Sequence, residues 1–61
     1  MNKKDIKNFL DDIYEMGTGS WNTLQGVRIT CNSFWDATFE IDNQKLDYDD
    51  AIDYLYLKLK F

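Results

Sequence analysis

The chain has 61 residues, of which 16% are aromatic, and a formal net charge of −4. This length allows one small domain, residues 1–61, and a domain of this size buries only about 60% of its unfolded surface. A single cysteine excludes an internal disulfide, and the lack of histidine disfavours a zinc site. The sequence has no run of about 18 apolar residues, the length that a membrane-spanning helix needs. We therefore expect a cytoplasmic protein with an aromatic-rich core and without a metal or cofactor.

Apolar spacing predicts an amphipathic helix over residues 3–16. Its apolar residues recur at i, i+3, i+4 and i+7: Ile6, Phe9, Leu10 and Ile13. Asn2 is a suitable N-cap, and Gly17 can take the positive φ that ends many helices. Three acids are expected on the face opposite the apolar stripe: Asp11, Asp12 and Glu15.

Alternation with period two predicts strands between residues 20 and 42. The clearest strand spans residues 35–42, with Trp35 facing the core and three acids on the outer face: Asp36, Glu40 and Asp42. Residues 27–31 alternate in the same way, and Asn32 with Ser33 is expected to form the turn between the two strands. Residues 21–24 can add a third strand, joined by a turn or a bulge at Gln25–Gly26, with Trp21 also expected in the core.

A second helix is predicted after a polar turn at residues 42–45. Asp47 is a good N-cap, an apolar stripe runs from Tyr48 to Leu59, and the opposite face carries Asp49, Asp50 and Asp53. Residues 54–61 also alternate with period two and could be a strand, but the continuous stripe favours a helix. We therefore predict an α+β domain of order α-β-β-(β)-α, with both helices on one face of an antiparallel sheet of two or three strands.

Negative charge is concentrated in the body of the chain. Residues 8–57 carry ten carboxylates and two cations, Arg28 and Lys45, for a net charge of −8. Such a body repels nucleic acids and anionic membranes and attracts basic protein surfaces. The three acidic groups on the two helices and the outer strand face are therefore candidate protein-binding surfaces. The alternative is that they only keep a small protein soluble, although like charges at Asp49 and Asp53, four residues apart, lower helix stability.

Other functions have weaker support in the sequence. Phe34 has the opposite parity to Trp35 and is the ring most expected to be exposed as a protein contact, whereas base stacking usually needs a cationic groove that this chain lacks. Asp36 and Glu40 would lie about 13 Å apart on a strand, too far for a retaining pair of catalytic carboxylates. Cys31 alternates with apolar residues and is expected to be buried. We expect no enzymatic activity.

At the level of a class, the chain resembles the small acidic proteins that bacteriophages and mobile elements use as inhibitors, including anti-CRISPR proteins and DNA mimics. The resemblance rests on the 61-residue length, the acidic body and the Asp, Tyr, Phe, Asn, Lys and Ile usage. It implies a stoichiometric inhibitor that binds a basic, nucleic-acid-binding surface of a bacterial host protein. The alternative is a regulatory or structural module that forms a homodimer or contacts partner helices through exposed rings: Phe34, Tyr54, Tyr56 and Phe61.

Overall fold

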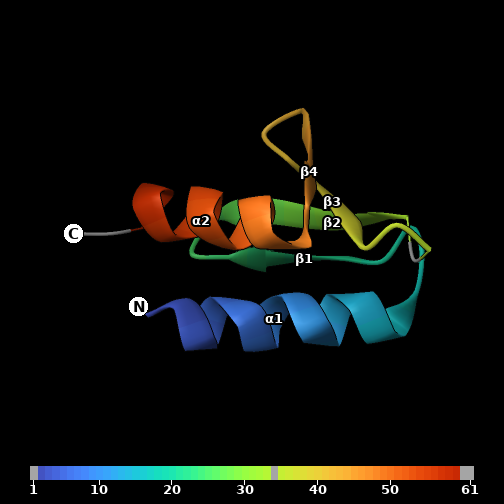
Figure 1. Ribbon diagram of the computed structural model, residues 1–61, viewed down its shortest axis with the longest axis horizontal. Helices are drawn as coiled ribbons and strands as arrows, with labels where there is room; N and C mark the ends of the chain where they lie inside the picture. The colour runs from blue at the N-terminus through green and yellow to red at the C-terminus, as the bar shows by residue number, and fades with distance from the viewer. Residues whose placement is uncertain (1, 34, 60–61) are drawn as a thin grey trace.

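The computed structural model describes residues 2–33 and 35–59 and has the predicted α+β class (Figure 1). Its elements are, in chain order, α1 (Lys3–Met16), β1 (Trp21–Leu24), β2 (Val27–Ser33), β3 (Thr38–Ile41), β4 (Gln44–Asp47) and α2 (Tyr48–Lys58). The four strands form one antiparallel sheet in the order β1-β2-β3-β4. The prediction of two or three strands therefore missed one, β4.

Both helices begin where the sequence predicts. The side-chain oxygen of Asn2 accepts a hydrogen bond from the Asp5 amide at 2.9 Å, and Asp47 caps α2 by accepting from the Asp50 amide at 3.0 Å. Gly17 ends α1 with a φ of 98°, a region that glycine enters without steric strain. The helical prediction for residues 54–58 is confirmed, while residues 60 and 61 lie outside the described part of the chain.

Two hairpins depend on two-residue turns in which both residues have positive φ. These are Gln25 and Gly26 (50° and 85°), as predicted, and Asp42 and Asn43 (52° and 65°). Such turns match the right-handed twist of the flanking strands, so the chain can reverse within two residues. The polar turn predicted over residues 42–45 is therefore too long, because Gln44 already begins β4.

The connection between β2 and β3 differs most from the prediction. Asn32 and Ser33 belong to β2, a register shift separates Cys31 from Ser33, and residues 35–37 are a turn instead of the start of a strand. Inward and outward positions alternate only within a regular ladder, so the bulge and the turn break the predicted parity. Trp35, predicted to be in the core, is 90% exposed, and Trp21 is 53% exposed.

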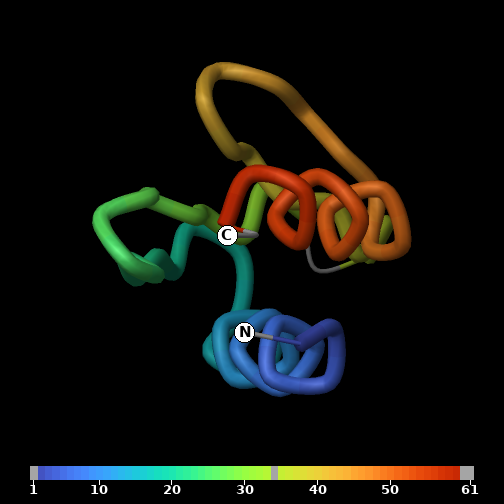
Figure 2. Tube along the Cα trace, turned by 90° about the vertical axis from the view of Figure 1, so that its left-hand side faces the viewer, coloured from blue at the N-terminus to red at the C-terminus, as the bar shows by residue number. Residues whose placement is uncertain are grey.

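The core lies between one face of the sheet and both helices. The buried apolar residues of the cluster are Ile6, Leu10, Ile13, Leu24, Ile29, Cys31, Phe39, Ile41, Ala51, Leu55 and Leu59. α1 packs against β1 and β2, α2 packs against β3 and β4, and the helices contact each other. Figure 2 looks along the two helices and shows α1, in blue, beside α2, in orange and red. The opposite sheet face is left open. Neither described helix combines the length and apolar character required to cross a bilayer.

Candidate functional site

The two helices lie side by side and run in opposite directions. Lys3 in the first turn of α1 forms a 3.1 Å ion pair with Asp53 in the second half of α2. At the other end of the contact, the Tyr48 hydroxyl at the start of α2 donates a 2.6 Å hydrogen bond to Asp11 in the later half of α1. These two contacts fix which parts of the helices are neighbours, and therefore which charges gather at each end of the molecule (Figure 1).

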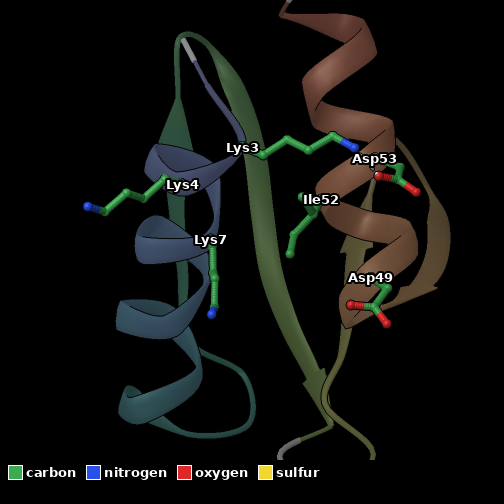
Figure 3. A pocket seen from close by; sticks show the side chains of 6 residues that line it. All are labelled: Lys3, Lys4, Lys7, Asp49, Ile52 and Asp53. Carbon is green, nitrogen blue, oxygen red and sulfur yellow. Dashed lines mark hydrogen bonds and ion pairs between the residues drawn. The ribbon is translucent and has the colours of Figure 1, made fainter.

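A groove of about 420 Å³ follows the contact between the helices (Figure 3). It is lined by Lys3, Lys4, Lys7, Asp49, Ile52 and Asp53. In Figure 3, Lys3 reaches across to Asp53, Ile52 points toward α1, and Lys4 points away from α2. Of the three acids predicted on one face of the second helix, Asp53 therefore pairs with Lys3 of the same chain, whereas Asp49 only lines the groove.

Asp11 does not lie on a fully exposed face, as the helical projection predicted. Its side chain is partly buried between the helices, where it accepts the hydrogen bond from Tyr48. Burial and this hydrogen bond both raise the pKa of the Tyr48 hydroxyl. The projection measured Asp11 only against the apolar stripe of its own helix and could not include the neighbouring helix. Asp12 and Glu15 are exposed, as predicted.

The three acids predicted for one outer strand face are separated in the structure. Asp36 lies in the turn before β3, Glu40 lies on the open sheet face opposite Lys45, and Asp42 lies in the turn after β3. The Asp42 carboxylate accepts a hydrogen bond from the Tyr54 hydroxyl at 2.5 Å and pairs with Lys58 at 3.0 Å. These contacts, the Tyr54 hydrogen bond first, lower the pKa of Asp42. Asp42 therefore links the β3–β4 turn to α2.

One end of the molecule gathers acids from separate parts of the chain, and we call it the acidic end. It is the end at which α1 finishes and α2 begins, on the right in Figure 1. Ser33 of β2 pairs with Thr38 of β3, and Thr38 pairs with Asp47 at the end of β4. The β2–β3 turn therefore lies at the same end as the start of α2. The carboxylates of the acidic end are Asp12, Glu15, Asp36, Asp47, Asp49 and Asp50, and all six residues are exposed.

The acids at the start of α2 repel one another. The charge of Asp47 is the largest cause of a raised pKa at Asp50, followed by desolvation, a side-chain hydrogen bond with Asp47 and the charges of Asp53 and Asp49. Asp47 must nevertheless stay close to Asp50, because it caps the helix through the Asp50 amide. The positive end of the α2 dipole offsets part of this repulsion. Ionised carboxylates at this site therefore oppose their neighbours, and a cationic partner would relieve them.

The opposite end of the molecule is where the cations gather. It includes the first turn of α1, the last turn of α2 and the β1–β2 turn, and its cations are Lys3, Lys4, Arg28 and Lys58. Of the acids at this end, Asp42 and Asp53 are paired with Lys58 and Lys3, and Asp5 lies in the first turn of α1. The molecule therefore has separated charges along its length, an arrangement that follows from the antiparallel helices and that chain order alone does not reveal.

The open sheet face is polar and holds a feature that the sequence analysis missed. The Arg28 guanidinium lies 4.2 Å from the centroid of the Trp21 ring, a cation–π contact that occupies one face of the indole. Beside it is a shallow hollow of about 350 Å³, lined by Arg28, Thr30, Glu40, Asp42 and Asn43. Residues 21 and 28 are on neighbouring strands of a hairpin, so the predicted Gln25–Gly26 turn was the signal that could have found this pair.

The aromatic anchors proposed for self-association are not displayed as expected. Tyr54 and Tyr56 are partly buried and pack against the core, and the ammonium groups of Lys58 and Lys3 lie 5.9 Å and 5.3 Å from their ring centroids. Phe34 and Phe61 lie outside the described residues. The two proposed anchors that lie within the described residues are therefore only partly exposed, and self-association stays a prediction.

The described residues contain no group of three or more His, Cys, Asp or Glu side chains placed to hold a metal ion. Cys31 is fully buried, and burial raises the pKa of its thiol. Comparison with known protein families, with curated proteins and with solved structures found no match for this chain. The arguments about function therefore rest on the charges and the exposed side chains described above.

Proposed function

We propose that the protein is a non-enzymatic inhibitor that binds, through its acidic end, a basic and nucleic-acid-binding surface of a bacterial protein. The acidic end presents six exposed carboxylates from α1, the β2–β3 turn, the end of β4 and α2. Carboxylates held at fixed positions on helices and turns can occupy a site built from Lys and Arg, and the unbalanced charge increases the rate of association.

The observation that carries the proposal is that this charge arrangement opposes the stability of α1. Asp12 and Glu15 lie near the carboxyl end of the helix, where the backbone dipole is negative, and its last turn holds no basic residue. Lys3 and Lys4 lie at the amino end, where the dipole is positive. A charged surface needed only for solubility could be arranged in the opposite sense without this penalty. Binding to a cationic surface gives a reason for the acids to be where they are.

The test compares two triple variants with the same change in net charge. One reverses the acidic end (Asp12→Lys, Glu15→Lys, Asp50→Lys), and the control reverses acids elsewhere on the surface (Asp5→Lys, Glu40→Lys, Asp53→Lys). Each protein is immobilised and loaded with the heparin-retained protein fraction of a bacterial lysate, which is enriched in nucleic-acid-binding proteins. Bound proteins are eluted with a salt gradient and, separately, with duplex DNA.

We expect the wild-type and control columns to retain the same proteins and the acidic-end variant to lose them. Retention should decrease steeply with salt, because paired surface charges are screened within about 10 Å at 0.1 M ionic strength. Duplex DNA should release the same proteins if their basic site normally takes nucleic acid. Equal retention by the two variants would contradict a specific role of the acidic end, and retention that resists both salt and DNA would contradict the mechanism.

A further inference from the structure

Trp35 is the most exposed large apolar side chain among the described residues. Its exposed fraction is 90%, compared with 70% for Leu57, 58% for Met16 and 53% for Trp21. Burying an aromatic side chain removes roughly 150–250 Å² from water, and a domain of this length has few other sources of stability. The chain therefore leaves Trp35, like Trp21, outside the core although the core would gain from it.

Ordered backbone holds this indole away from the core. The bulge after Cys31 changes the direction of β2, and the Ser33 hydroxyl accepts a hydrogen bond from the Asp36 amide at 3.3 Å across the turn. Ala37 then has a φ of 51°, which is uncommon for a residue with a Cβ atom. Thr38 is the next residue and is buried. Its hydroxyl accepts a 3.3 Å hydrogen bond from the side-chain amide of Asn32. The backbone that follows Trp35 is thus held by hydrogen bonds between residues 36–38 and residues 32–33.

We propose that Trp35 is the anchor of the interface, and that its indole enters an apolar pocket on the partner protein. The inference rests on the proposed function and specifies how that surface binds. Tryptophan is among the residues most enriched in interface hot spots, where a large apolar side chain fills a pocket from which water is excluded. Such an anchor loses little conformational entropy on binding, since the turn already fixes its backbone.

The charges around Trp35 identify the chemistry of the pocket rim. Asp36 is the next residue, and Asp47 lies opposite Thr38 in the paired strands. A pocket rimmed by Lys and Arg therefore matches both the indole and its acidic surroundings. The same carboxylates would repel a nucleic acid, an anionic lipid surface and the acidic end of a second copy. The occupant that fits is a protein with an apolar pocket inside a basic surface.

The experiment compares Trp35→Ala with Trp21→Ala on the columns described above, using the same heparin-retained lysate fraction as the probe. Neither substitution changes charge, and Trp21 lies on the open sheet face, away from the acidic end. We expect Trp35→Ala to weaken retention at least about tenfold and Trp21→Ala to leave it within about twofold of wild type. Equal melting temperatures of Trp35→Ala and wild type confirm that the fold is unchanged, as its 90% exposure implies.

The outcome separates the two proposals. Loss of retention in the acidic-end triple variant but not in Trp35→Ala would overturn the anchor and leave the proposed function standing. Loss in Trp35→Ala with full retention by the triple variant would overturn the acidic surface and support the anchor. Loss in both variants supports both proposals, and a wild-type column that retains nothing overturns both.

Fluorescence tests the identity of the occupant. The Trp21→Phe variant has Trp35 as its only tryptophan. Adding the protein eluted from the wild-type column should shift its emission to shorter wavelength, as expected when an indole leaves water. An unchanged spectrum would overturn the pocket. A shift produced instead by phosphatidylglycerol vesicles, or by raising the concentration of the variant alone, would replace the proposed partner with a lipid surface or a second copy.

Discussion

α1 and α2 lie side by side in opposite directions, but their charges have opposite relations to their backbone dipoles. α2 carries Asp49 and Asp50 in its first turn and Lys58 in its last, which is the stabilising arrangement. α1 places lysines in its first turn beside a single acid, Asp5, and has acids but no cation near its carboxyl end. The local charges of α2 therefore favour its helix, whereas those of α1 mostly oppose it.

This difference shows that α1 depends more on tertiary packing than α2 does. The apolar stripe of α1 contributes three fully or almost fully buried residues, Ile6, Leu10 and Ile13. The same helix also forms a hydrogen bond and an ion pair with α2. Because this packing holds α1 in place, its surface charges can be arranged for binding a partner instead of for the stability of the helix.

The largest effect is expected from deleting core side chains of either helix. Leu10 and Leu55 are fully buried, and each Leu→Ala substitution should lower the free energy of unfolding by about 2–5 kcal/mol. Urea titrations followed by circular dichroism measure the loss, with Leu57→Ala as the exposed control expected within about 0.5 kcal/mol of wild type. A clearly smaller loss for Leu10→Ala than for Leu55→Ala would contradict the greater dependence of α1 on packing.

The helix caps should contribute next. Asn2→Ala and Asp47→Ala each remove a side-chain acceptor for a helix amide and should lower stability by about 1 kcal/mol. Asp47→Asn keeps an acceptor and removes the charge that repels Asp50, so it should be close to neutral in the same urea titration. If Asp47→Asn destabilised as much as Asp47→Ala, the charge of Asp47 would matter to the fold more than its cap.

Exchanging charges within each helix tests the comparison directly. The double variant Lys4→Glu, Glu15→Lys keeps the net charge, aligns α1 with its dipole and should raise stability by about 1 kcal/mol. The matched exchange in α2, Asp49→Lys with Lys58→Glu, should lower it by a similar amount, and it also removes the ion pair with Asp42. Both changes should shrink in 1 M NaCl. Equal signs for the two exchanges would show that the dipole does not explain the difference.

The smallest effects are expected in the pH dependence. Asp42 has a lowered pKa when folded, so its contribution is present above its unfolded pKa and is lost as pH falls through the folded pKa. Asp50 has a raised pKa when folded, so its ionisation opposes folding and protonation relieves this as pH falls through the folded pKa. At pH 7, Asp42→Asn should lower the melting temperature and Asp50→Asn should raise it. Melting curves between pH 7 and pH 3 should show the Asp50→Asn difference disappearing in acid and the Asp42→Asn difference shrinking as pH approaches the lowered folded pKa of Asp42.

Much of the fold follows from local patterns in the sequence. Periodicity and caps placed α1 at its observed bounds, and Asp47 marked the start of α2. β4 escaped notice because the preceding turn uses only Asp42 and Asn43, and because Leu46 is the only apolar residue of a four-residue edge strand. One apolar residue among polar neighbours gives too weak an alternation to distinguish a strand from a turn.

The arrangement of the candidate site depended on contacts that local patterns do not contain. Asp12 and Glu15 were correctly predicted to be exposed, but their proximity to the start of α2 follows from the antiparallel helix pair. The exposure of Trp35 was missed because the alternation of residues 38–41 was extended back over residues 35–37, which form a turn. A parity rule applies only as far as the ladder continues. The predicted contact residue Phe34 lies outside the described residues, and Trp35, predicted to be in the core, is exposed.

The strictly sequential order of the sheet has a consequence for how quickly the chain can fold. Every strand pairs with its neighbour in the chain, so the two-residue-turn hairpins can form after closing only short loops. The seam between α1 and α2 is different, because Lys3 and Asp53 are 50 positions apart. We expect hairpin formation to take microseconds and the docking of α1 on α2 to be the slow closure. Tyr48, which bonds to Asp11 at this closure, would then report on the late stage of folding.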